Sequence, residues 1–136
     1  MYELFEHTAD IGLRVLAKDL GSLFEEAAMA LVSLMVANPE SVQPVQEVAF
    51  RLSAPRLDDL LFDWLAEMLY TFAARHLLLA EFHVRIVQDT LTATARGEPV
   101  DRSRHQLAME VKAITYHGLT VRREGDGWLA EVIVDI

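Results

Sequence analysis

The chain has 136 residues, of which 52% are hydrophobic, so its composition excludes a disordered protein and fits one domain with a substantial core. Acidic residues outnumber basic ones by 21 to 12, and the resulting net charge of −9 disfavours direct binding to nucleic-acid phosphates. The absence of cysteine excludes disulfides, thiolate zinc sites and cysteine nucleophiles.

The first third of the chain is predicted to form two strands followed by a helix. Residues 2–6 and 12–17 are short stretches of partly alternating apolar and polar side chains, which is typical of strands. Residues 22–38 repeat apolar side chains at the helical period and so predict an amphipathic helix. Ser22 and Glu25 have the spacing of a capping box, which favours a helix that begins at this serine.

A second strand and helix pattern follows. Residues 48–52 alternate as a half-buried strand does, and residues 56–76 carry a continuous apolar stripe at helical spacing. Three acidic side chains, Asp59, Asp63 and Glu67, recur at intervals of four on the opposite face of this helix. The simpler interpretation of these three residues is a face in contact with solvent, and the alternative is a surface for a basic partner.

The second half of the chain is predicted to consist of hairpins. Residues 81–88 and 91–96 form the first hairpin, and residues 111–123 and 128–135 form the last. Residues 97–106 lie between them as a polar loop of the kind that often carries function. These elements together predict one α+β domain, a two-layer sandwich of a largely antiparallel sheet with both helices on one face.

Two aspartates far apart in the sequence are candidates for a metal site. Asp10 lies in the connection between the first two predicted strands, and Asp135 lies directly before the terminal carboxylate of Ile136. If the fold brings them together, three carboxylate groups converge, and such a cluster favours a hard divalent cation with oxygen ligands. The alternative is that Asp10 caps a turn and the chain end makes no defined contact. The residues alone leave both interpretations open.

Five separated stretches together resemble the archease family. They are FEHTADIG (residues 5–12), LLFDWL (60–65), RGEP (96–99), EVKAITYHGL (110–119) and VDI (134–136). The stretches follow the family's order and span essentially the whole chain, which makes the resemblance specific. It implies a compact fold of the SHS2-like kind.

The resemblance further implies that the protein is not an enzyme by itself. Archeases are accessory factors of the RtcB-type RNA ligase, the GTP-dependent enzyme that joins tRNA halves and repairs broken RNA. The implied role is to promote guanylylation of the ligase and to allow multiple turnover. RNA would be contacted at most indirectly, through the ligase.

The resemblance also assigns residues to a site. It implies that Asp10, Asp135 and the main-chain carboxylate of Ile136 hold a divalent cation, and an all-oxygen ligand set favours Ca²⁺ or Mg²⁺ over zinc. Further polar residues are expected to support this site or to face the ligase from the same end of the molecule. They are His7, Glu98, Asp101, Arg104, His105, Glu110 and Lys112. A lysine is common in the family at the position of Arg104, so this chain keeps the charge but changes its geometry.

Two other functions compete with the accessory role. A chaperone-like adaptor for protein and RNA would use the cation only to stabilise its fold. A stand-alone hydrolase is disfavoured, because the sequence shows no nucleophile paired with a base. The first residues lack the features of a signal peptide, and no apolar run is long enough to span a bilayer, so we expect a cytoplasmic protein without membrane segments.

Overall fold

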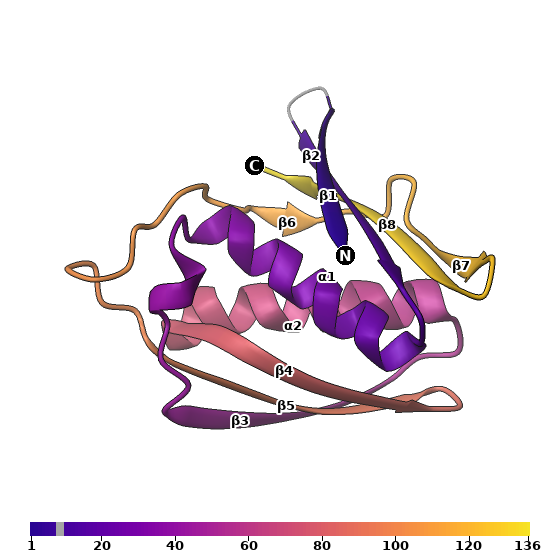
Figure 1. Ribbon diagram of the computed structural model, residues 1–136, viewed down its shortest axis with the longest axis horizontal. Helices are drawn as coiled ribbons and strands as arrows, with labels where there is room; N and C mark the ends of the chain where they lie inside the picture. The colour runs from indigo at the N-terminus through magenta and orange to yellow at the C-terminus, as the bar shows by residue number, and fades with distance from the viewer. Residues whose placement is uncertain (8–9) are drawn as a thin grey trace.

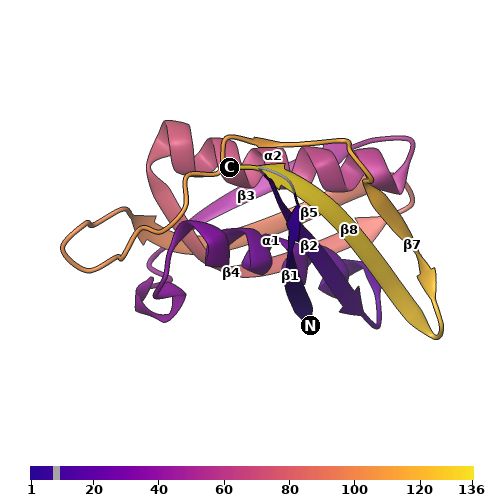
Figure 2. The same cartoon turned by 90° about the horizontal axis from the view of Figure 1, so that it is seen from above.

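Two α-helices lie side by side between two antiparallel sheets (Figures 1 and 2). The structure, a computed structural model, describes residues 1–7 and 10–136, and only the backbone at Glu6 and His7. Both helices contact strands of both sheets, so they cover one face of each sheet. The predicted α+β class with antiparallel strands is confirmed. The strands divide into two sheets rather than one, which makes three layers where the sequence predicts two.

The secondary-structure elements follow one another in the described residues with antiparallel pairing throughout. They are β1 (Tyr2–His7), β2 (Asp10–Ala17), α1 (Leu20–Met35), β3 (Gln46–Ser53), α2 (Leu57–Arg75), β4 (Leu77–Val87), β5 (Thr90–Pro99), β6 (Ala113–Ile114), β7 (Thr120–Glu124) and β8 (Gly127–Asp135). A short 3₁₀ turn, Pro39–Ser41, lies between α1 and β3. One sheet has the strand order β1-β2-β8-β6, with β7 also paired to β8, and the other has the order β3-β5-β4.

Helix α1 begins earlier than the sequence predicts. Its N-cap is Asp19, whose Oδ1 accepts a hydrogen bond from the backbone N–H of Ser22 at 2.8 Å. The predicted cap at Ser22 is therefore wrong, because an aspartate three residues earlier satisfies the same end of the helix. Glu25 does not cap the helix. Its carboxylate accepts a hydrogen bond from the backbone N–H of Val84, on the edge strand β4, at 2.9 Å.

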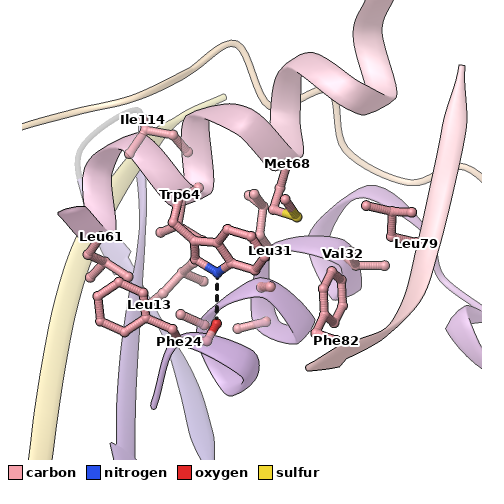
Figure 3. Close-up of a cluster of buried hydrophobic side chains, with 14 of the residues drawn as sticks. Leu13, Phe24, Leu31, Val32, Leu61, Trp64, Met68, Leu79, Phe82 and Ile114 are labelled. Atoms are coloured by element: carbon pink, nitrogen blue, oxygen red, sulfur yellow. Dashed lines mark hydrogen bonds between the residues drawn. The ribbon is translucent and has the colours of Figure 1, made fainter. Parts of the chain in front are cut away.

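The core is centred on Trp64, which projects from α2 and is fully buried (Figure 3). Its indole N–H donates to the carbonyl oxygen of Phe24 in α1 at 3.0 Å. Its ring meets Phe50 of β3 and Phe82 of β4 edge-on, with centroids 5.6 Å and 6.3 Å apart. One side chain thus joins the two helices to the three-stranded sheet. No helix in the described part of the chain is long and apolar enough to cross a membrane.

Three strand boundaries differ from prediction in ways that matter for the site. Strand β2 begins at Asp10, so this residue lies within a sheet and not in a connection. Strand β5 continues to Pro99, so the polar loop begins only after it. The predicted strand over residues 111–123 is split into β6 and β7 by a turn in which Gly118 adopts a φ of 67°, a conformation that favours glycine.

Candidate functional site

The two candidate aspartates lie directly opposite each other on neighbouring strands. Asp10 of β2 pairs with Asp135 of β8, and Asp135 also pairs with Ala113 of β6 on its other side. Side chains alternate along a strand, and the fully buried Val134 faces the helices, so Asp135 faces outward. Directly opposed residues in an antiparallel pair have Cβ atoms roughly 5 Å apart, which brings the two carboxylates to the same outer surface.

The end of the chain is fixed in place. The backbone N–H of Lys112 donates to the carbonyl oxygen of Asp135 at 2.7 Å, and the backbone N–H of Thr115 donates to that of Ile133 at 3.0 Å. The side chain of Ile136 is partly buried and packs against the core. The last residues therefore sit between two pairing strands and above the core, so their position relative to Asp10 is defined.

The chemistry of this position fits an oxygen-bound cation. Like charges directly opposite each other destabilise a sheet, and a cation between Asp10 and Asp135 would relieve that repulsion. No three His, Cys, Asp or Glu side chains come together as metal ligands in the described residues. Among the described residues, main-chain oxygens of Ile136, which directly follows Asp135, are the nearest further candidates for ligands. The backbone of His7 pairs with Asp10, but its side chain lies outside the described residues, as do Thr8 and Ala9.

A second polar group is built around Glu98 near the end of β5. Glu98 is only 6% exposed, and its side chain accepts three hydrogen bonds. The donors are a guanidinium N–H of Arg104, the backbone N–H of Gln43 at 2.8 Å, and Nε2 of His105 at 2.9 Å. The backbone N–H of Asp101 donates to Nδ1 of His105, so the proton of the neutral ring resides on Nε2. These bonds, with Arg104 contributing most, lower the pKa of Glu98 from its usual 4.5 to about 2.

Arg104 uses its whole guanidinium group to fasten the loop. Besides Glu98 it binds Oδ2 of Asp101 at 3.2 Å and the carbonyl oxygen of Ser41 at 3.3 Å. Its pKa is raised, mainly by the hydrogen bond to Glu98. The pKa of Asp101 is lowered, first by the hydroxyl of Ser103 and also by Arg104. The arginine therefore acts as an internal brace between the loop and the segment after α1.

Two further residues, which are not among the predicted site residues, shape the chain near this cluster. The side-chain amide of Asn38 donates to the carbonyl oxygen of Arg104 at 2.9 Å and accepts from the N–H of Gln106 at 2.8 Å. Gly97 lets β5 approach β4, because a Cβ at this position would overlap the carbonyl oxygen of Leu78. The sequence places Asn38 at a helix end and Gly97 in a loop, and only the folded contacts reveal what each residue does.

Besides Asp10, Asp135, Ile136 and His7, the predicted site residues fall into two groups. The first is the loop cluster, whose members bind one another beside the three-stranded sheet: Glu98, Asp101, Arg104 and His105. Glu98 and His105 are buried, so their side chains cannot contact a partner. The loop projects from one end of the molecule, away from the C-terminus (Figures 1 and 2). Glu110 and Lys112 are exposed on the segment that leads from the loop to β6.

Acid should weaken the loop cluster in a defined pH range. Because the folded pKa of Glu98 lies below its usual value, its contribution to stability is present above pH 4.5 and is lost as the pH falls from 4.5 towards 2. Asp101 acts in the same direction. We expect the free energy of unfolding, measured by urea titration across this range, to fall more steeply in the native chain than in Glu98→Gln. Equal slopes would contradict the role assigned to Glu98.

Comparisons of the sequence and of the structure with known proteins find the same family. The model of the archease protein family (MTH1598/TM1083) matches residues 2–136. The protein archease of Methanopyrus kandleri is 38% identical over 139 residues, covering 99% of both chains, and that of Pyrococcus furiosus is 36% identical over 140 residues, covering 99% and 98%. The solution structure of Methanobacterium thermoautotrophicum protein 1598 has a TM-score of 0.88 at 33% identity, covering 99% and 98%. The crystal structure of a Thermotoga maritima archease, described as a possible chaperone, shares the fold with a TM-score of 0.70 at 22% identity, covering 100% and 98%.

Proposed function

The chain belongs to the archease family, and we propose that it is an accessory activator of the RtcB-type RNA ligase and not an enzyme by itself. In this role it promotes guanylylation of the ligase and allows multiple turnover in tRNA splicing and RNA repair. RNA is reached only through the ligase, in the cytoplasm. The observation that carries the proposal is the direct pairing of Asp10 with Asp135 on an outer surface, next to an anchored chain end.

The residues that would hold a divalent cation are Asp10, Asp135 and the main-chain carboxylate of Ile136. Oxygen donors suit Ca²⁺ or Mg²⁺, and such an ion supplies positive charge where negative charge develops during phosphoryl transfer. The net charge of −9 supports electrostatic steering, in which the acidic protein is attracted towards a basic face of the ligase.

The chain's own contribution is to hold these oxygen atoms in place. The segment after the loop cluster is fastened to α1, because the backbone N–H groups of Ala108 and Met109 donate to the carbonyl oxygens of Met35 and Leu34 at 2.9 and 3.0 Å. The same segment then reaches Lys112, which binds the backbone of Asp135. In this proposal Glu98 and its partners support the site from a distance. Glu110 and Lys112, whose side chains are exposed, face the ligase.

A ligation assay tests the proposal directly. Purified ligase with GTP, a divalent metal salt and cleaved tRNA is compared with and without the chain, first with enzyme in excess and then with substrate in excess. We expect the chain to raise product yield strongly when substrate is in excess and much less in a single turnover. No effect in either regime would rule out the activator role.

Extending the chain beyond Ile136 should impair activation. A few added residues convert the terminal carboxylate into an amide, which removes one anionic oxygen ligand but leaves the core side chain of Ile136 in place. We expect the extended protein to unfold at nearly the same temperature and to stimulate the ligase at least tenfold less. A matched extension at the N-terminus is the control, and equal stimulation by both extended proteins would refute the role of the carboxylate.

The runner-up function is a chaperone-like adaptor in which the cation is purely structural. This function is supported by the description of the Thermotoga maritima archease, which has the same fold, as a possible chaperone. The two functions differ in what chelation does to the isolated chain. A structural cation predicts a large drop in melting temperature on adding chelator, because an ion that binds only the folded state stabilises it. A small drop together with lost ligase stimulation favours the activator.

A further inference from the structure

On the outer face of the three-stranded sheet, a threonine on the central strand lies between two arginines on the flanking strands. Thr92 of β5 pairs with Arg51 of β3 on one side and with Arg85 of β4 on the other. All three residues are exposed. Within the described part of the chain, neither guanidinium group makes a hydrogen bond or ion pair.

Another arginine on the same face, two rows away, lies between carboxylates. Arg96 of β5 pairs with Glu47 of β3 and with Glu81 of β4, and its Nε lies 3.1 Å from Oε1 of Glu47. In that row the cation is compensated by a carboxylate across the strands. The row of Arg51 and Arg85 has two cations and no carboxylate, in a protein whose net charge is −9. That row is therefore the part of this face where an anion would be favoured.

The surface between the arginines is hollowed. Arg51, Arg85 and Thr92 line this hollow together with Val87, Gln88 and Thr90. A second hollow, which includes Ala49 and Thr94, adjoins it at Thr92. The two arginine Cα atoms are about 10 Å apart, because two strand spacings separate them. Two long side chains rising from those positions can reach one small anion above Thr92, whose hydroxyl adds a donor between them.

We propose that this hollow binds a single phosphate group, either as free phosphate or as the phosphate of a nucleotide. Guanidinium groups match phosphate oxygens in pairs of charge-assisted hydrogen bonds, which favours this anion over chloride. The hollow does not suit a nucleic-acid backbone, because Glu47 and Glu81 flank it two rows away and would repel a continuous track of phosphates.

The proposed phosphate site is independent of the carboxylate pair. The helices separate the two sheets, so strands β3 and β4, which carry the two arginines, lie across the helices from the chain end (Figure 1). An anion bound there would not touch Asp10 or Asp135. The phosphate proposal can therefore fail while the activator role holds, and the reverse is equally possible.

The test is a titration of the full chain followed by ¹H–¹⁵N NMR at constant ionic strength. Inorganic phosphate is expected to shift the Nε–H signals of Arg51 and Arg85 and the amide of Thr92, whereas chloride is not. Arg51→Gln and Arg85→Gln should each weaken binding about tenfold, the factor for one charge-assisted hydrogen bond. Arg75→Gln, which removes an exposed charge from the end of α2, should leave binding unchanged.

Two further titrations test which phosphate compounds the hollow accepts. Adenosine monophosphate should shift the same signals, and a short single-stranded RNA without terminal phosphates should not. Binding of that RNA at these residues, a response to an acidic peptide but not to phosphate, or phosphate binding that survives both arginine substitutions would each overturn the proposal.

Discussion

Replacing Asp135 by asparagine is expected to reduce stimulation of the ligase to the level of the ligase alone. The substitution keeps the shape of the side chain and the backbone pairing to Asp10 and Ala113, but it removes one of two opposed charges. Stability should therefore change by no more than about 1 kcal/mol, because lost repulsion offsets any lost contact. Multiple-turnover ligation and thermal unfolding with and without Ca²⁺ measure the two effects.

The control for this substitution is Asp126→Asn, which removes the same charge from the exposed hairpin between β7 and β8. Asp126→Asn should stimulate the ligase as the native chain does and keep any thermal shift caused by Ca²⁺. Asp10→Asn should behave like Asp135→Asn. Full stimulation by either of these two variants would remove the carboxylate pair from the mechanism.

Trp64→Ala is expected to cause the largest loss of stability, about 3–5 kcal/mol. The fully buried indole contacts Phe50 and Phe82 and also donates to the carbonyl oxygen of Phe24, so its removal opens a cavity and breaks a buried hydrogen bond. Domains of this size have total stabilities of roughly 5–15 kcal/mol, so the variant should be partly unfolded in the cell. Urea-induced unfolding measures the difference.

Trp64→Phe separates the two contributions. It keeps an aromatic ring against Phe50 and Phe82 but removes the indole N–H, so its cost should be clearly smaller than that of the alanine variant. A Trp64→Ala protein within about 1 kcal/mol of the native chain would show that the layers are held together elsewhere. Neither variant tests the carboxylate pair, which lies on the outer surface of the other sheet.

The helices were the most predictable elements, because each buries one continuous apolar stripe. The predicted range of 56–76 agrees closely with α2, Leu57–Arg75. The start of α1 was less predictable, since Asp19 and Ser22 are both good capping residues and only the folded backbone selects between them. The division of the strands into two sheets depends on which strands pair over long distances, and alternation within a strand carries no information about its partner.

The candidate site was predictable in part. The sequence identifies Asp10 and Asp135 as a pair only on the condition that their strands meet, and the register of β2 with β8 supplies that condition. The loop cluster was not predictable in detail. Glu98 looks like a solvated loop residue in the sequence, but backbone and side-chain groups from Gln43 and His105 enclose it. Burial of this kind results from contacts between segments that are far apart in the chain.

The hydrogen bond from Val84 to Glu25 has a consequence for how copies of the protein behave at high concentration. Strand β4 borders its sheet, and an unoccupied strand border is a template on which other chains can grow a shared sheet. Here a negatively charged side chain already occupies one backbone N–H of that border, and the register between Leu79 and Glu81 is irregular. An approaching chain would have to displace the carboxylate and straighten the strand first, so self-association through this border is opposed by the fold itself.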